Sequence, residues 1–371
     1  MHELDGSEVS TLRWINERAV LRLLFDSDRA RSVAEIAAEC TLSRPTVEGA
    51  LAQLVGDGWV LESEPQTSGR GAGRPAKYYA FADRAKLIMG VDLGPHGVVC
   101  TVATLRGAVV ATTRMPDLEI PTGQQALEAL ADAVSAALAQ SGRAEEDVIA
   151  LTVGLPAIVD EAGDIALTVV VPEWRTFGLP ERIRARFASM HVIFENDANL
   201  ATVGEHAWGS AVGARSMVNV LVGHRVGAGI IVDGRLTRGM HGAAGEIGAL
   251  PAARWESAYR RLTDPTGTVQ DTLDGIAEED PEALRRLEKF AEDLARGIAA
   301  LCLVLDPEVV IIGGGSTHFG ERLIEPLQAA VAALTLFPVE LRTSALGPSA
   351  VALGGVAMSR DHLTRTVLQI A

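Results

Sequence analysis

Two groups of residues in this 371-residue sequence could do chemistry, and the chemistry differs between them. The first is the glycine-rich segment 66–77, which contains Arg70, Arg74 and Lys77 and no acidic residue. A basic and sterically slim segment suits contact with the DNA backbone or with a narrow minor groove. The second is Asp197, a carboxylate that could accept a hydroxyl proton during phosphoryl transfer. A DNA contact and a transferase base are therefore the first two hypotheses.

Composition restricts the classes of protein to which the chain can belong. With 48% hydrophobic residues, the chain can form two or three packed domains, and disorder of the whole is excluded. The formal net charge of −15 argues against non-specific coating of nucleic acid. However, residues 1–86 carry 11 Lys and Arg against 13 Asp and Glu, so most of the acidity lies in the remainder. A local basic surface near the N-terminus is compatible with this distribution.

Cysteine usage and the first residues indicate the compartment. Cys40, Cys100 and Cys302 lie far apart and form no C-x-x-C pair, so the sequence predicts neither a disulfide framework nor a cysteine-rich zinc site. The acidic residues 1–5 do not resemble a signal peptide, and no apolar stretch approaches the ~20 residues of a membrane span. We therefore expect a cytoplasmic protein without membrane contact.

The N-terminal part of the chain has the pattern of a winged helix-turn-helix domain. Ser32 can cap one helix, and Ser43 can cap a second helix that has Pro45 in its first turn. An earlier helix with an apolar stripe precedes them, and strand-like runs at 58–61 and 76–81 flank the basic segment. The residues expected to pack inside are Leu12, Ile15, Ala19, Leu23, Ile36, Cys40, Leu42, Val47, Ala50, Leu51 and Leu54.

Such a domain inserts the early residues of its second motif helix into the major groove. Gly49 costs about 1 kcal/mol in a helix relative to Ala, and close approach to DNA is one reason to tolerate that cost. The alternative is a small helical packing module with a solvated loop. The residues expected to contact DNA are Arg44, Pro45, Thr46, Glu48 and Gly49 of this helix and Arg70, Arg74 and Lys77 of the wing.

From residue 87 onward, short apolar runs alternate with helical stretches, which is typical of a mixed sheet covered by helices. The first series has a helix at 124–139 and strands at 88–91, 98–102, 108–111 and 148–153. A similar series follows, with a helix at 281–305 and strands at 217–222, 228–232 and 309–312. We therefore expect a duplicated α/β fold behind the DNA-binding domain, with domains at 1–84, 85–195 and 196–371.

Four segments of this second part together resemble the ROK family, which groups sugar kinases with sugar-responsive transcriptional repressors. They are 221–250 (LVGHRVGAGIIVDGRLTRGMHGAAGEIGAL), 195–199 (ENDAN) followed by Gly204 and Glu205, 306–315 (DPEVVIIGGG), and 154–156 (GLP) with Asp160. The resemblance covers roughly residues 88–365. It implies an α/β fold in which the winged helix-turn-helix precedes a two-lobed, actin-like ATPase domain of the ribonuclease-H-like kind.

The same resemblance implies a sugar site. Asn196, Asp197 and Glu246 would form hydrogen bonds with sugar hydroxyls, and Gly154 lies in the matching loop of the first half. Val170 stands where the family usually has an Asn, which removes one expected contact. Retained binding of a sugar or sugar derivative and a vestigial pocket, whose acidic residues only satisfy backbone amides, both remain open.

The family's structural zinc is not expected here. Many members hold that zinc through a His and a cysteine cluster shortly downstream. In this chain Ala249 replaces the His, and residues 251–255 contain no Cys. We therefore expect no metal.

The two loops that hold phosphate in the family's kinases also differ in this chain. The first is usually Asp-x-Gly-Gly-Thr-Lys, whereas residues 92–97 read DLGPHG, so Pro95 removes a backbone donor and the Thr and Lys are missing. The second is usually Gly-Thr-Gly-x-Gly, whereas residues 223–227 contain His224 and Arg225. Arg225 could fill the vacant nucleotide site, bind an anion or form a structural ion pair. We expect no kinase activity and no cofactor, with Asp197 a vestigial base.

Together these features favour a transcriptional regulator similar to the family's repressors. The expected partners are double-stranded operator DNA, a sugar or sugar derivative as effector, and further copies of the chain in a homodimer or dimer of dimers. One alternative is a sugar kinase with an added DNA-binding head. The other is a ligand-independent DNA-binding protein with a vestigial pocket.

Overall fold

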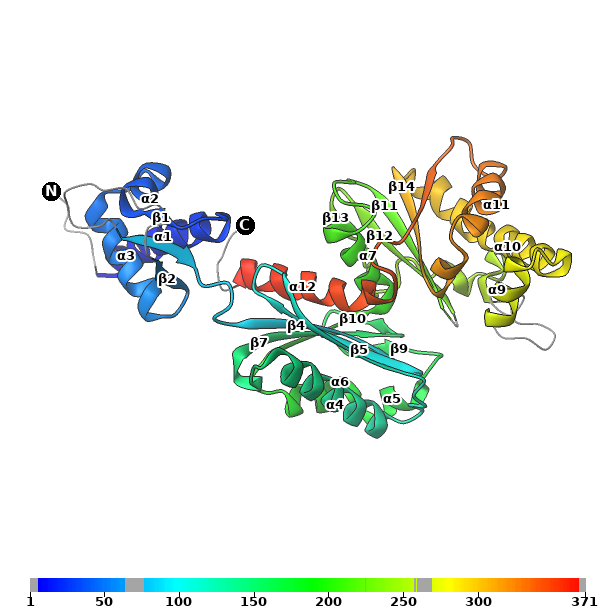
Figure 1. Ribbon diagram of the computed structural model, residues 1–371, viewed down its shortest axis with the longest axis horizontal. Helices are drawn as coiled ribbons and strands as arrows, with labels where there is room; N and C mark the ends of the chain where they lie inside the picture. Colours follow the sequence, from blue (N-terminus) through cyan, green and yellow to red (C-terminus); the bar gives the residue numbers. More distant parts are fainter. Residues whose placement is uncertain (1–5, 64–76, 224, 257, 259–268, 367–371) are drawn as a thin grey trace.

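The computed structural model describes residues 6–63, 77–223, 225–256, 258 and 269–366 (Figure 1). Its N-terminal part, which we call the head, consists of α1 (Gly6–Phe25), β1 (Arg31–Ser32), α2 (Val33–Cys40), α3 (Arg44–Gly56), β2 (Val60–Ser63) and β3 (Tyr78–Phe81). The strands form an antiparallel sheet in the order β1-β3-β2. Helices followed by the β2–β3 hairpin make the head a winged helix-turn-helix.

Local sequence explains where the head helices begin. The Ser32 hydroxyl accepts a hydrogen bond from the Glu35 amide, while the Glu35 carboxylate accepts one from the Ser32 amide. At the start of α3 the Ser43 hydroxyl accepts from the amide of Thr46 at 3.3 Å. Thr41 ends α2 with φ +56°, a left-handed conformation that favours glycine. Both predicted caps are confirmed.

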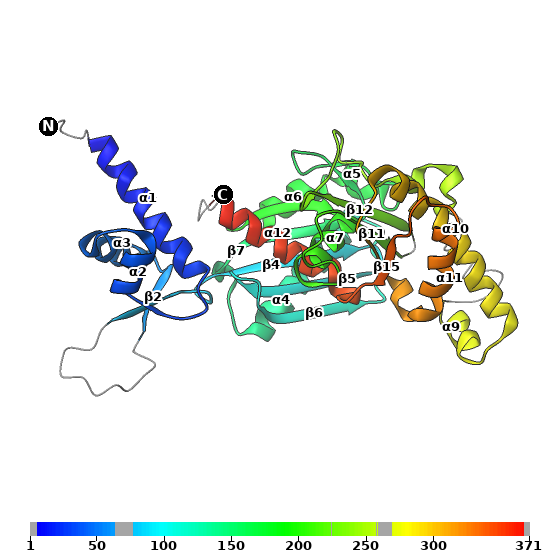
Figure 2. The ribbon, with the colours of Figure 1, turned by 90° about the horizontal axis from the view of Figure 1, so that it is seen from above.

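The stripe predicted for α1 is partly wrong. Leu12 is 49% exposed and Ile15 is 47% exposed, because the N-terminal half of α1 projects away from the rest of the head (Figure 2). Only the C-terminal half of α1 packs inside. The buried apolar residues of the head are Val20, Leu21, Leu24, Ile36, Val47, Ala50, Leu51, Leu54, Val60 and Phe81.

The first of two α/β sheets has the strand order β10-β7-β4-β5-β6. Its strands are β4 (Leu87–Gly94), β5 (Gly97–Thr104), β6 (Val109–Pro116), β7 (Val148–Leu155) and β10 (His191–Asn196). In Figure 1 helices cover one face, while the C-terminal helix α12 (Ala350–Thr366) lies on the other. The covering elements and connections are α4 (Gly123–Ser141), η1 (Glu145–Asp147), β8 (Ile158–Val159), β9 (Ile165–Leu167), α5 (Pro172–Phe177) and α6 (Leu179–Arg186).

The second sheet repeats the arrangement of the first, in the order β13-β12-β11-β14-β15. In each sheet one central strand pairs antiparallel on one side and parallel on the other, which confirms the predicted duplication. Its strands are β11 (Met217–Val222), β12 (Val226–Val232), β13 (Arg235–Leu236), β14 (Val309–Gly314) and β15 (Glu340–Thr343). Its other elements are η2 (Ile247–Ala249), η3 (Pro251–Ala253), α9 (Val269–Ala277), α10 (Pro281–Leu305), η4 (Gly315–Phe319), α11 (Glu321–Ala332) and η5 (Gly347–Ser349).

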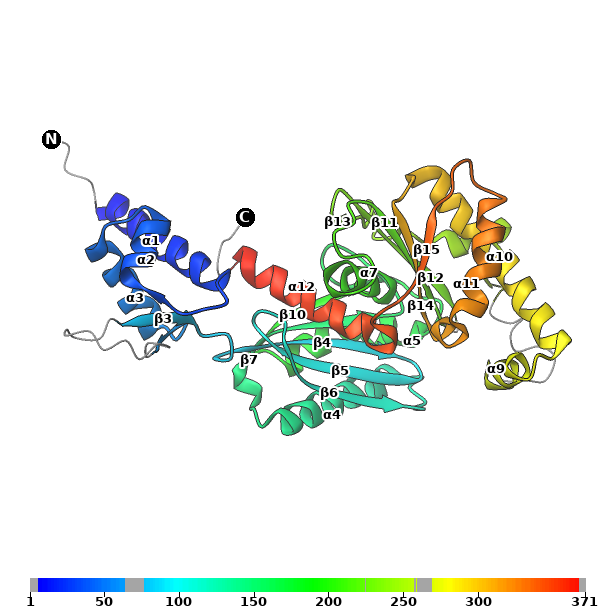
Figure 3. The same cartoon turned by 45° about the horizontal axis from the view of Figure 1, so that its top comes forward.

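Helix α7 (Asp197–Trp208) crosses α12 between the two sheets (Figure 3). Glycines make this crossing close: an ideal Cβ at Gly354 would lie 1.8 Å from the Leu200 carbonyl oxygen, and one at Gly204 would lie 2.5 Å from that of Ala350. Gly355 approaches the first sheet in the same way, at Gly90. The two helices therefore cannot separate or rotate independently without losing close backbone packing.

Buried polar contacts hold α12 at both ends of this crossing. The Ser359 hydroxyl donates to the Met89 carbonyl at 3.1 Å and contacts the Thr152 hydroxyl at 2.8 Å, which ties α12 to the first sheet. The buried Glu205 carboxylate of α7 accepts from the Leu346 amide at 3.1 Å, just before α12.

Among the described helices, none combines the length and the apolar character needed to cross a bilayer.

Candidate DNA and ligand sites

The outer face of α3 carries the residues predicted to read DNA bases. Arg44, Pro45, Glu48 and Gly49 are exposed, and no atom lies within 4 Å of the position that a Cβ at Gly49 would take. The hydroxyl of Thr46 lies 2.7 Å from that of Ser43, so Thr46 also stabilises the helix start. The five predicted positions thus lie together in the first turns of one solvent-facing helix.

The wing is represented only by its two strands. Arg70 and Arg74 lie outside the described residues. Lys77, at the base of the wing, is exposed, and its Nζ lies 2.9 Å from a carboxylate oxygen of Glu62 on β2. A role of Lys77 at phosphate would therefore require exchange of this surface ion pair, which is a small cost for exposed charges.

A second candidate site lies where strands of the first sheet end. Asp92 is near the end of β4, and Asp197 begins α7 directly after β10. Glu246 approaches from the second sheet, on the segment between β13 and η2. We call Asp92, Asp197 and Glu246 the carboxylate site.

Burial changes the ionisation of these carboxyl groups. Desolvation, followed by the charge of Asp197, raises the pKa of Asp92 to about 7. Desolvation also raises the pKa of Asp197 to about 7, with a further contribution from Glu246. Partial burial raises the pKa of Glu246. Near neutral pH the site can therefore both donate and accept hydrogen bonds, which suits a ligand rich in hydroxyls.

The other two predicted ligand residues border this site in different ways. The Asn196 side chain accepts from the Asn199 amide at 3.0 Å and donates to the Ala157 carbonyl at 3.1 Å, so it is engaged by the backbone. Gly154 lies in register between Asp92 and Glu195. An ideal Cβ at Gly154 would lie 2.7 Å from Val351 and 3.0 Å from Leu200, so this glycine lets α12 and α7 approach the sheet.

Three functional candidates escaped the sequence reasoning. One is Asp92, noted there only as part of an altered phosphate loop. The others form an ion pair: Arg238 Nε lies 2.6 Å from Glu195 Oε2, although Glu195 is on the first sheet and Arg238 follows β13 of the second. The buried Glu195 also accepts from the Asn199 side chain at 2.9 Å. Glu195 and Arg238 both lie inside segments that resemble the family's motifs, and this resemblance was the signal that could have identified them.

The two segments that align with the family's phosphate loops form short turns. Gly223 donates to the Arg225 carbonyl at 2.8 Å, and Arg225 is exposed, without an ion-pair partner among the described residues. His224 lies outside those residues. The β4–β5 turn is tied down where the Ile120 amide donates to the Pro95 carbonyl at 3.0 Å. Gly314 has φ +75° and packs so tightly that a Cβ would lie 2.3 Å from the Val222 carbonyl oxygen.

The part of the chain that the structure describes offers no cluster of side chains placed to hold a metal ion. No three His, Cys, Asp or Glu side chains there converge to hold an ion. Cys40, Cys100 and Cys302 are free thiols. His206 contacts the Ala214 carbonyl at 2.9 Å, consistent with a structural role.

A winged head followed by two sheets of one topology, joined through α7 and α12, defines an actin-like ATPase fold with an N-terminal winged helix-turn-helix module. The sequence profile of the ROK family matches residues 88–265 and 256–362. The chain belongs to the ROK family.

Relatives of two kinds resemble this chain. The xylose repressor of Caldicellulosiruptor bescii is 24% identical, and the match covers 94% of this chain and 96% of that protein. The glucokinase of Halalkalibacterium halodurans is 26% identical, but the match covers only 72% of this chain and 93% of that protein. The kinase therefore matches the family domain, whereas the repressor matches the head as well.

A solved structure shows the same division. The crystal structure of a ROK family transcriptional regulator, a homologue of the E. coli MLC protein, superimposes with a TM-score of 0.71. It is 19% identical in sequence, and the match covers 97% of this chain and 98% of that chain. The shared fold thus extends through the head and both sheets.

Proposed function

We propose that this protein is a DNA-binding transcriptional repressor whose family domain senses a sugar or sugar derivative. The observation that carries the proposal is the match of full-length repressors to the whole chain, since the glucokinase match stops short of the head. The solvent-facing α3, with its open Gly49, supports it. We assign the DNA-reading domain to residues 1–84 and the two lobes of the sensing domain to 85–195 and 196–371, with α12 of the second segment packed back on the first sheet, in a cytoplasmic homodimer.

In this proposal Arg44, Pro45, Thr46, Glu48 and Gly49 face base edges and nearby phosphates, while Arg70, Arg74 and Lys77 contact the backbone or a minor groove. A dimer presents two such heads to a palindromic operator. An effector acts only through its different affinities for the DNA-competent and DNA-incompetent states, so DNA and effector weaken each other by the same factor.

The DNA assignment is tested by selecting bound duplexes from fragmented genomic DNA and measuring their affinity over a range of salt concentrations. We expect Arg74→Ala to weaken binding of all duplexes and reduce the salt slope by about 1. Arg44→Ala should also relax sequence preference, at a cost of about 1–3 kcal/mol. The matched control is Arg285→Ala, since Arg285 is an exposed arginine on α10. Unchanged binding in both head variants would refute the assignment.

For the effector, Asp197 and Glu246 are proposed to bind sugar hydroxyls beside Asn196 and the Gly154 backbone. Thermal unfolding in the presence of D-xylose, D-glucose and their phosphates tests this. A stabilisation by one compound that is lost in Glu246→Ala supports an effector site. If no compound at millimolar concentration changes the unfolding temperature, the result favours a ligand-independent DNA-binding protein.

A second candidate function is a sugar kinase with a DNA-binding head. Asp197 favours it, because burial raises its pKa to about 7, a value suited to a general base near neutral pH. We propose instead that the chain is not an enzyme, because both phosphate loops lack the family's Gly-Thr pattern. ATP consumption with any hexose, abolished in Asp197→Asn, would reverse this view.

A further inference from the structure

We propose that Arg106, in the turn between β5 and β6, is a positioning residue that fixes the DNA-reading head on the first sheet. We further propose that α7 connects this turn to the carboxylate site. The consequence for DNA binding rests on the proposed function, whereas the consequence for the position of the head does not.

Arg106 joins the sheet to the head by polar contacts. Its Nη2 donates to the Leu24 carbonyl at 2.9 Å and to the Ser27 carbonyl at 2.8 Å, both at the C-terminal end of α1. The Leu24 carbonyl also accepts from the Ser27 amide at 3.3 Å, so the guanidinium adds a second hydrogen bond to the turn that ends α1, from another domain. The Arg106 amide donates to Asp83 at 2.9 Å, and its guanidinium lies 5.4 Å from the ring centre of Phe81. The Arg106 side chain thus contacts the first and the last elements of the head, α1 and β3.

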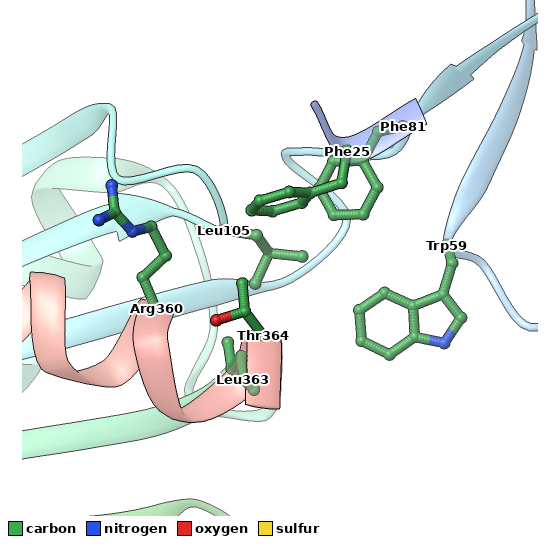
Figure 4. Close-up of a pocket in the computed structure, with 7 residues that line it drawn as sticks. All are labelled: Phe25, Trp59, Phe81, Leu105, Arg360, Leu363 and Thr364. Atoms are coloured by element: carbon green, nitrogen blue, oxygen red, sulfur yellow. The ribbon is translucent and has the colours of Figure 1, made fainter. Parts of the chain in front are cut away.

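Apolar packing surrounds this contact. Figure 4 shows Phe25 and Phe81 of the head facing Leu105 of the turn and Leu363 of α12. The two rings pack edge to face with centroids 5.1 Å apart. The cavity left between these side chains has a volume of only about 10 Å³. A second cavity of about 560 Å³ lies beside it, between Trp59 of the head and the two histidines His191 and His362. The head is therefore packed against the first sheet on the Arg106 side, while an open cavity lies on the Trp59 side.

The same turn also receives the far end of α7. An ideal Cβ at Gly107 would lie 2.6 Å from Cζ2 of Trp208, which is the last residue of α7. The guanidinium of Arg360 on α12 lies 5.0 Å from the Trp208 ring centre. Trp208 therefore lies between the β5–β6 turn, which contacts the head, and helix α12.

Helix α7 begins at Asp197 and ends at Trp208, a length of about 18 Å at 1.5 Å per residue. Because the glycine contacts with α12 leave no slack, a shift at the Asp197 end moves Trp208 with it. Trp208 packs on Gly107, so such a shift changes the packing of the turn that carries Arg106. A ligand at the carboxylate site can in this way alter the position of the head.

The position of the head is tested without DNA or ligand. Spin labels at Ala52→Cys on α3 and Glu128→Cys on α4 report the distance between head and first sheet in the full chain with Cys40→Ser. We expect the distance distribution of Arg106→Ala to be about twofold wider than that of the parent. The matched control is Arg184→Ala, which also loses two bonds to carbonyls, at Ala162 and Gly163, but none to the head.

Arg106→Lys gives the graded result, because a single ammonium cannot match the fork geometry of the guanidinium. A distance distribution for Arg106→Lys that is wider than the parent's and narrower than that of Arg106→Ala supports the proposal. If Arg106→Ala does not fold, the distribution of Arg106→Lys is compared with the parent's alone, and a wider distribution supports the proposal. Distributions as narrow as the parent's in both variants would overturn it.

The second arm uses selected duplexes with two half-sites. Inserting about five base pairs turns one half-site to the opposite face, and a parent with fixed heads should lose about 100-fold in affinity. Arg106→Ala should lose less than about tenfold, because mobile heads adapt to both spacings. If Arg106→Ala only destabilised the protein, its affinity would fall by the same factor for both duplexes. That result would count against a positioning role for Arg106. If the parent binds no duplex, the proposed function fails, while the distance measurement still decides the role of Arg106.

Discussion

Helices α3 and α7 begin in the same way and end in opposite environments. Each starts with a polar side chain that accepts a hydrogen bond from an amide three residues later, Ser43 in α3 and Asn196 in α7. Each also contains a glycine. Around Gly49 of α3 there is open space, whereas a Cβ at Gly204 of α7 would meet the Ala350 carbonyl at 2.5 Å.

The difference teaches what each helix can do. The exposed face of a helix, such as that of α3 around Gly49, can present side chains to a partner, and these can change at little cost to folding. A helix that is packed against backbone on several sides cannot change without moving its neighbours, so it is suited to connecting two places in the molecule. The same local rules thus produce an exposed face in one case and a closely packed helix in the other.

The largest expected effect is at the α7–α12 crossing. Gly354→Ala places a methyl group 1.8 Å from the Leu200 carbonyl oxygen, so the two helices must move apart. We expect a loss of about 3 kcal/mol in the free energy of unfolding, measured by urea denaturation. Gly56→Ala is the control, since no atom lies within 4 Å of its Cβ position. Equal stability of the two variants would mean that α7 is not tightly packed.

The next effect is a pH dependence at the N-terminal end of α7. Asp92 and Asp197 have pKa values raised to about 7, so the native state binds more protons than the unfolded state between pH 4 and 7. The free energy of unfolding should therefore fall as pH rises through this range. Asp92→Asn should reduce this fall, measured by denaturation at pH 5 and pH 8. The prediction fails if the variant shows the parent's full pH dependence.

A smaller effect is expected at the start of α3. Ser43→Ala removes the hydroxyl that accepts from the Thr46 amide. We expect the head to lose about 1 kcal/mol of stability. Hydrogen exchange of α3 amides in the full chain measures this locally, and exchange in α7 serves as the internal control. Unchanged exchange in α3 would show that Pro45 alone sets the helix start.

The smallest effect has the opposite sign. Gly49→Ala fits the open space around α3, so it should stabilise the helix by about 0.8 kcal/mol. If Gly49 allows close approach to DNA, the same variant should bind selected duplexes less tightly. Its thermal unfolding and duplex affinity are measured on one preparation. A variant that is more stable and binds equally well would remove Gly49 from the DNA-reading face.

Much of the fold could be predicted because it follows from local pattern. The caps at Ser32 and Ser43 depend on residues three positions apart, and the repeated strands depend on short apolar runs. The exposure of Leu12 and Ile15 could not be predicted, because their apolar spacing is helical whether or not another element covers it. The spacing of apolar residues identifies a helix but does not supply the surface that buries it.

The candidate sites divide along the same line. Asp197 and Glu246 could be selected because motif segments surround them. Asp92 required the register of β4 and β7, which brings it beside Gly154. The contact of Arg106 with α1 spans about 80 positions of sequence, and nothing near either partner indicates it.

The sequence by itself determined the caps of the head helices, one long helix and the central strands in each half, and their duplication, since each depends on neighbours along the chain. It did not indicate α7 or α12. Only the tertiary structure decided which carboxyl groups share one desolvated site and which turn holds the head. The physical reason is that desolvation and close packing arise between segments distant in sequence. Gly354 illustrates this. A side chain is excluded there by the carbonyl of Leu200, which lies 154 positions away in the sequence.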